Sequence, residues 1–164
     1  MSKAAKPIPE GLHTVTPQLV IRGAANAIDF YKKALGAQEV SRFSMPDGKI
    51  GHAEIKIGDS TIFINDEMPS PGGAKSPQTV GGCTTTLNIY VPDVDTTFKN
   101  AIAAGGKETM AVADQFWGDR YGAFTDPFGH TWSVATRKED LSKQEMEERA
   151  KAFFASAQAQ RKTA

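Results

Sequence analysis

The sequence predicts an α+β fold made of two βαβββ modules and a C-terminal helix. The observation that predicts the duplication is that residues 18–31 and residues 86–99 share one pattern, a β-branched strand followed by a helix start, 68 residues apart. That spacing exceeds the roughly 20 to 50 residues of solenoid repeats. In a chain of 164 residues we therefore expect two half-domains that bury each other in one core and together form a curved, barrel-like mixed sheet.

The first module is expected over residues 13–67, after a polar, proline-containing lead-in at residues 1–12. β-branched residues in alternation predict its strands, and the Pro-Asp-Gly and Gly-Asp segments predict the turns between them. Ala24, Ile28 and Tyr31 have helical spacing, and Gly36 supplies the stop. The expected elements are a strand at 14–21, a helix at 24–35, and strands at 38–45, 49–57 and 60–65.

A linker rich in proline and glycine is expected at residues 68–83, because that composition sustains neither the helix nor the strand period. The second module then repeats the first over residues 84–137. Its expected elements are a strand at 84–91, a helix at 94–104, and strands at 107–113, 120–125 and 130–136.

Residues 138–164 lie outside the duplication. Their pattern predicts an amphipathic helix over residues 139–157, followed by a tail. Ser142 followed by Glu145 is a capping box, in which each side chain satisfies a free backbone N–H at the start of a helix. The expected inner stripe consists of Met146, Arg149, Ala150, Phe153 and Phe154.

Composition narrows the classes of function. Lys plus Arg and Asp plus Glu each count 19, so no net positive field attracts nucleic acid or anionic lipid. No apolar run approaches the roughly 18 residues of a membrane span, and we expect a cytoplasmic protein. The single cysteine, Cys83, excludes an internal disulfide and a cysteine-based zinc cluster, and it is expected to have a packing role.

Three strings resemble the vicinal-oxygen-chelate superfamily, which includes glyoxalase I, extradiol dioxygenases and bleomycin-resistance proteins. They are Ala24-Ala25-Asn26-Ala27-Ile28-Asp29-Phe30-Tyr31, Gly51-His52-Ala53-Glu54-Ile55 and Asp126-Pro127-Phe128-Gly129-His130-Thr131-Trp132. They are similar to the PhnB-type, glyoxalase-like branch in particular. The resemblance implies that each half-sheet curls into a trough and that two troughs enclose a cavity, within one chain or across a dimer.

In metal-dependent members, His, Glu or Gln residues on the first and last strand of each module bind a divalent ion. The resemblance places these positions at Thr16, near Phe63, at Thr86 and at Ser133. Hydroxyls and a phenyl ring are poor ligands for Zn²⁺, Ni²⁺ or Fe²⁺, so we expect no metal. Gln18 lies two residues from Thr16 and therefore points to the same face, but one ligand does not make a site.

His52 and Glu54 also point to one face of a strand. We expect a polar pair that contacts a ligand, and both residues are candidates for proton transfer; the alternative is that they bind a metal ion. His130 follows a turn, and a role in packing and turn geometry is expected for it.

The loop before the expected strand at 120–125 concentrates Phe116, Trp117 and Arg120. Aromatic rings stack on planar or cationic guests. Arg120 lies 68 residues after His52, so the two are expected to face one pocket, where Arg120 binds an anion or pairs with Glu54.

Two functions remain open. The first is a metal-free protein that binds a small aromatic or amphipathic molecule in the inter-module cavity. The alternative is a lyase, isomerase or dioxygenase that uses a divalent ion held by an atypical ligand set. The expected partner is a second copy of the chain in a homodimer, because strand edges are exposed. The candidate ligand-binding residues are Gln18, His52, Glu54, Phe63, Phe116, Trp117 and Arg120.

Overall fold

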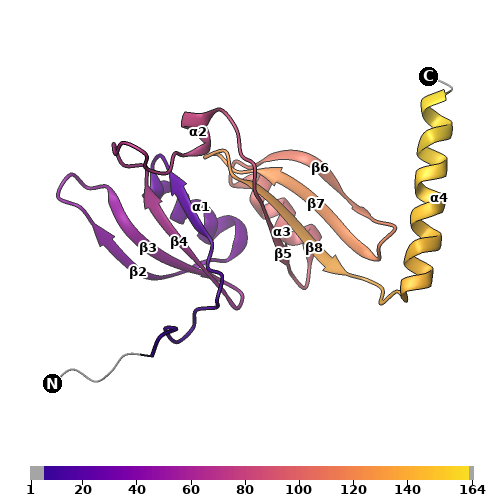
Figure 1. The fold of residues 1–164 in the computed structure, drawn as a ribbon, viewed down its shortest axis with the longest axis horizontal. Coiled ribbons are helices and arrows are strands. Elements are labelled where there is room, and N and C mark those ends of the chain that lie inside the picture. Colours follow the sequence, from indigo (N-terminus) through magenta and orange to yellow (C-terminus); the bar gives the residue numbers. More distant parts are fainter. Residues whose placement is uncertain (1–5, 163–164) are drawn as a thin grey trace.

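The computed structural model describes residues 6–162, so parts of the expected lead-in and tail lie outside the described residues. Two βαβββ modules follow each other along the chain (Figure 1). The first contains β1 (Gln18–Ile21), α1 (Ala24–Leu35), β2 (Gln38–Ser44), β3 (Ile50–Ile57) and β4 (Ser60–Asp66). The second contains β5 (Thr86–Tyr90), α3 (Val94–Ala103), β6 (Lys107–Asp114), β7 (Asp119–Thr125) and β8 (Thr131–Arg137).

Each module forms its own four-stranded mixed sheet, in the orders β1-β4-β3-β2 and β5-β8-β7-β6. β1 runs parallel to β4 and β5 runs parallel to β8, while the remaining pairs are antiparallel. In each module, the connection between the two parallel strands passes through the helix and the two strands that follow it. The predicted α+β fold with two repeated modules is therefore confirmed.

Several elements differ from the sequence-based prediction. The C-terminal helix spans Lys143–Lys162 rather than residues 139–157, and the fifth strand spans Thr86–Tyr90 rather than residues 84–91. β1 begins at Gln18 rather than at residue 14, although the carbonyl of Pro17 still accepts a hydrogen bond from Phe63 N–H (2.9 Å). The linker contains a four-residue helix, α2 (Pro77–Val80). Ser76 caps α2 by accepting from Thr79 N–H, and Pro77 stands at its first position, where no N–H is needed.

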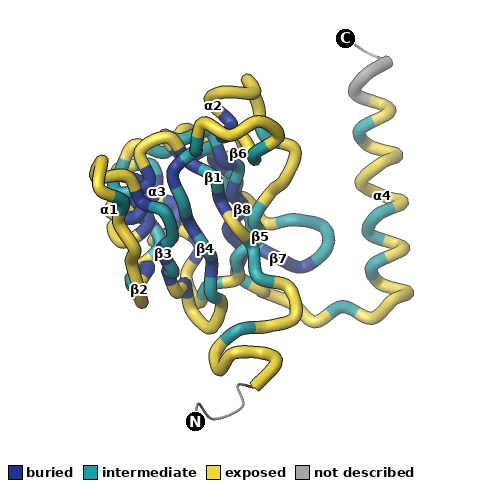
Figure 2. Tube along the Cα trace, turned by 60° about the vertical axis from the view of Figure 1, so that its left-hand side comes forward, coloured by how far each residue is buried: buried dark blue, intermediate teal, exposed yellow. Residues whose placement is uncertain are grey.

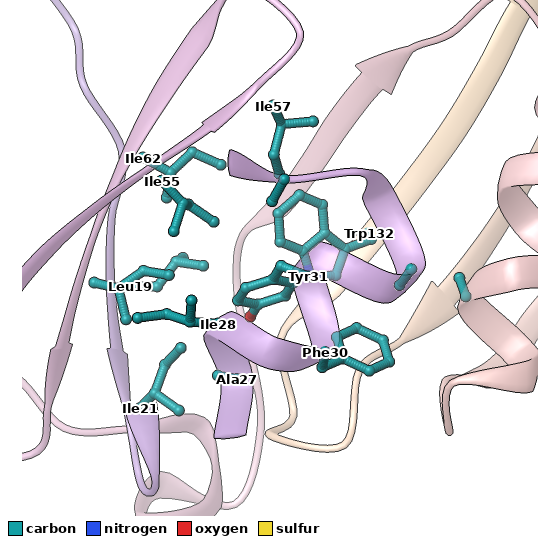
Figure 3. Packing of buried hydrophobic residues seen from close by; sticks show 14 of the residues in the cluster. Leu19, Ile21, Ala27, Ile28, Phe30, Tyr31, Ile55, Ile57, Ile62 and Trp132 are labelled. Carbon is teal, nitrogen blue, oxygen red and sulfur yellow. The ribbon is translucent and has the colours of Figure 1, made fainter. Parts of the chain in front are cut away.

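The two modules meet through their helices, since α1 packs against α3 and both lie in one hydrophobic core. Tyr31 of α1 and Trp132 of β8 are fully buried, and their ring centroids lie 5.2 Å apart. Figure 3 shows the two rings beside each other, with isoleucines of the first sheet around them. The core therefore crosses the boundary between the modules.

A buried carboxylate connects the same two residues. Asp126 Oδ2 accepts from Tyr31 Oη (2.7 Å) and from Trp132 Nε1 (3.0 Å). Its Oδ1 accepts from the backbone N–H groups of Phe128 and His130, both at 2.9 Å. Burial and the Asp126 carboxylate raise the pKa of Tyr31 well above its usual value, so the tyrosine keeps its proton for this bond.

The C-terminal helix α4 (Lys143–Lys162) starts with the predicted capping box, because Ser142 N–H and Oγ both donate to Glu145 Oε2. Figures 1 and 2 show α4 at the side of the second module and outside the sheets, with exposed residues along most of its length. Of the predicted inner stripe, Phe153 and Phe154 are 47% and 57% exposed. No helix in the described part of the chain is both long and apolar enough to cross a membrane.

Asp126→Asn is expected to lower the free energy of unfolding by about 3 kcal/mol, because an amide has one acceptor oxygen for four donors. Tyr31→Phe removes one donor and keeps the ring, so a loss of about 1 kcal/mol is expected. Urea unfolding at neutral pH measures both. Equal losses in the two variants would contradict the connecting role of Asp126.

Candidate functional site

Four of the predicted site residues share the face of the first sheet that points away from α1. On β3, Ala53 and Ile55 are buried in the core, so His52 and Glu54, which alternate with them, point to the open face. Phe63 of β4 is opposite Glu54 in the register and Gln18 of β1 is opposite Phe63, which places both on the same face. We call these four residues the first-sheet group.

Weak polar and ring contacts connect the first-sheet group. His52 Nε2 lies 3.5 Å from Glu54 Oε1, and the His52 and Phe63 rings meet edge to face with centroids 4.8 Å apart. Gln18 Nε2 donates to Asn65 Oδ1 (2.7 Å) on the neighbouring strand. The side chains of His52 and Glu54 are 41% and 29% exposed, so both remain accessible to a ligand.

A second group lies on the second sheet, around Trp117 in the β6–β7 turn. Asp119 Oδ2 accepts from Tyr90 Oη (2.8 Å) and from Trp117 Nε1 (3.2 Å), and the Trp117 and Tyr121 rings lie 5.7 Å apart. The hydrogen bond to Asp119 raises the pKa of Tyr90. We call Tyr90, Trp117, Asp119 and Tyr121 the second-sheet group. Sequence reasoning missed Tyr90 and Asp119, because their contact spans 29 positions of the chain and no local pattern signals it.

Phe116 connects the second-sheet group to α4. Its ring centroid lies 5.0 Å from Trp117, 4.9 Å from Phe153 and 6.0 Å from Phe154. The aromatic residues of the turn and of α4 therefore form one row of rings. In the sequence these residues lie in two separate segments, and no local pattern connects them.

The structure places Arg120 away from both groups. Its guanidinium pairs with Asp95 at the start of α3 (2.7 Å) and with Asp114 (3.1 Å), and not with Glu54. On the same strand, Gly122 faces Phe98 of α3, so Arg120 lies on the helix side of the sheet. The expectation that Arg120 and His52 face one pocket is wrong.

The reason is a one-residue slip in the repeat. Phe63 on β4 and Ser133 on β8 are the corresponding positions of the two modules. Glu54 lies opposite Phe63 and Ala123 lies opposite Ser133, so Glu54 corresponds to Ala123. His52, two residues before Glu54, then corresponds to Tyr121. A shift of one residue along a strand moves a side chain to the other face. Tyr121, rather than Arg120, is therefore the counterpart of His52.

The donor set does not suit the metal ion that the resemblance implies. Thr16 precedes β1 and Thr86 pairs with Thr131, so neither of these expected positions lies beside the expected position on the last strand. The register instead aligns Gln18 with Phe63 and Asn88 with Ser133. Ser133 Oγ donates to Asn88 Oδ1, which engages both polar side chains with each other. In the part of the chain that the structure describes, no group of three His, Cys, Asp or Glu side chains is placed to bind a metal.

His130 belongs to the turn between β7 and β8, as its position after the Asp-Pro-Phe-Gly segment predicted. It is 8% exposed, and its backbone N–H donates to Asp126. Burial lowers the pKa of its imidazole, while Asp126 and a hydrogen bond with the backbone of Val20 act in the opposite direction. Nε2 of His130 is buried without a hydrogen-bond partner among the described residues.

The family model for the Glyoxalase/Bleomycin resistance protein/Dioxygenase superfamily matches residues 11–134. The chain belongs to this superfamily. The matched segment contains both βαβββ modules up to β8 and excludes α4. The resemblance that the three strings predicted is thereby confirmed.

Relatives in the superfamily share the modules but do not define a reaction. An uncharacterized protein of Mycobacterium bovis is 43% identical over 135 residues, which are 81% of this chain and 89% of that protein. The structure of an Arabidopsis thaliana gene product matches with a TM-score of 0.61 and 25% identity, over 76% of this chain and 98% of that one. The PhnB protein from Bacillus cereus shares the fold, with a TM-score of 0.60 and 18% identity over 76% of this chain and 99% of that one.

The stability of the protein is expected to fall as the pH decreases below 6.5, the ordinary pKa of histidine, because the unfolded chain then takes up a proton that buried His130 resists. The loss continues until the pH reaches the lower pKa of the folded state. His130→Asn should remove this part of the pH dependence. Urea unfolding of both proteins at about pH 7.5 and about pH 5.5 measures the change in the free energy of unfolding with pH. The same change in the variant and in the unmodified protein would contradict the assignment to His130.

Proposed function

We propose that the protein binds a small aromatic or amphipathic molecule on the open faces of its sheets, without a metal ion. The observation that supports this most is the first-sheet group, in which a half-buried Phe63 ring lies beside His52 and Glu54 on a face without covering helices. An apolar wall beside a few polar groups is the usual composition of small-molecule sites.

The second-sheet group supports the same ligand class. Trp117 and Tyr121 offer ring faces, and Asp119 fixes Trp117 and Tyr90 by hydrogen bonds. Rings that are held in place lose little entropy when a planar molecule stacks on them.

The two groups lie on different sheets, and no hydrogen bond or ring contact between described residues joins them. We propose that a second copy of the chain brings them together, with the first sheet of one copy facing the second sheet of its partner. Large apolar side chains on edge strands support this homodimer: Phe43 on β2 is 65% exposed, and Tyr90 on β5 is 60% exposed. Such edges are normally covered in native proteins.

Nile red, a neutral planar dye whose fluorescence rises in apolar surroundings, tests the binding proposal. Phe63→Ala and Trp117→Ala are each expected to weaken dye binding about tenfold with little change in Tm, since a stacking surface is lost. Ile8→Ala, which removes an exposed apolar side chain of the lead-in, is the matched control. Binding that EDTA abolishes would favour the metal-dependent alternative, and a large fall in Tm would assign the aromatic residue to the core.

Light scattering at micromolar concentration is expected to give the mass of a dimer. Phe43→Glu should shift the protein toward monomer, because it places a charge in the proposed interface, whereas Ile8→Glu should leave the mass unchanged. A monomeric mass for the unmodified protein would overturn the homodimer and leave the binding proposal to the dye experiment.

A further inference from the structure

A cavity of about 230 Å³ lies at the seam between the two modules. The first module contributes the segment before β1 and the start of β4, through Pro17 and Ile62. The second module contributes Leu87 and Ile89 of β5, and Trp132 of β8. None of the described side chains in the first-sheet group or the second-sheet group lines this cavity. It is therefore a different region from the open faces on which the proposed function rests.

The cavity borders the hydrophobic core. Ile62 and Trp132 are buried and belong to the core cluster, whereas Leu87 and Ile89 pack against that cluster and are only half-buried. Native cores leave few voids larger than a water molecule, because atoms that face a void lose dispersion contacts. A ligand that fills this space would restore those contacts for Leu87 and Ile89.

The entrance to the cavity lies beside the segment before β1. His13, Val15 and Ser60 belong to the lining and are exposed to solvent, and Val15 is 81% exposed. A small molecule can therefore reach the apolar side chains without the opening of either sheet.

The lining indicates a neutral ligand. Among the described residues that line the cavity, none is Asp, Glu, Lys or Arg. The hydroxyl groups of the lining, which belong to Thr16, Ser60 and Thr61, already donate hydrogen bonds within the protein. A charged ligand would lose its hydration in this space without gaining an ion pair, which is unfavourable.

We propose that this cavity is a second binding site, for a neutral molecule built on a single aromatic ring. An apolar cavity of about 150 Å³ is large enough to bind benzene. The volume of about 230 Å³ therefore accommodates one ring with a small substituent. Pro17, Leu87 and Ile89 supply apolar surface for such a ring, and Trp132 adds an aromatic contact.

Methyl NMR of the unmodified protein, labelled at the isoleucine and leucine methyl groups, tests the proposal with benzene as the probe. Saturable shifts are expected for Ile62, Leu87 and Ile89, because an aromatic ring changes the resonances of methyl groups beside it. The resonances of Ile21 and Ile28, which are fully buried and do not line the cavity, should stay in place. Benzoate and benzylammonium, which add a charge to the same ring, should need about hundredfold higher concentrations.

Leu87→Phe places a ring in the cavity and is expected to weaken benzene binding about tenfold. Val40→Phe, which adds a ring at an exposed position of β2, is the matched control and should leave the affinity for benzene unchanged. Trp117→Ala should also leave that affinity unchanged, although it is expected to weaken Nile red binding. The two binding sites are therefore tested independently of each other.

The absence of methyl shifts with benzene would overturn the proposal, as would equal shifts at Ile21 and Ile28. Equal binding of benzene and its charged analogues, or undiminished binding of benzene by folded Leu87→Phe, would overturn it as well. Because the benzene titration uses the unmodified protein, its result decides the proposal even if Leu87→Phe does not fold.

Discussion

The buried carboxylate of Asp126 is the constraint on which the arrangement of the two modules depends. It accepts from Tyr31 of the first module and from Trp132 of the second, and its other oxygen closes the turn that leads into β8. Three of the four hydrogen bonds are buried and the one from Phe128 is partly buried, so the loss of a buried partner leaves an unsatisfied group. A change at this one residue therefore affects the turn, the last strand and the packing of α1 together.

Placing both crossover helices in the shared core leaves the opposite faces of the sheets open. α1 and α3 occupy the inner faces, where Tyr31 and Trp132 meet. His52, Glu54 and Phe63 are then directed to solvent, as alternation along a strand requires. The same arrangement leaves β1 and β5 as edge strands of their sheets. The open faces that the proposed function uses thus follow from the way the modules pack.

At the positions where the resemblance places metal ligands, this chain carries side chains that suit a divalent ion poorly. Asn88 and Ser133 hydrogen-bond to each other, Phe63 has no donor atom, and Gln18 donates to Asn65. What these positions retain is a polar and aromatic surface. A fold of this kind supports many chemistries, so the activity depends on the side chains that a particular chain presents.

The sequence by itself determined the two modules, the turns, the capping box of Ser142 and the face shared by His52 and Glu54, because each rests on local periodicity or on contacts within a few residues. It failed at Arg120, where a slip of one residue in the repeat reversed the face, and at Tyr90 and Asp119, whose contact spans 29 positions of the chain. The contact of Phe116 with α4 and the unsatisfied Nε2 of His130 were likewise decided by tertiary structure alone. Strand register and packing depend on the balance of many distant contacts, which no local pattern records.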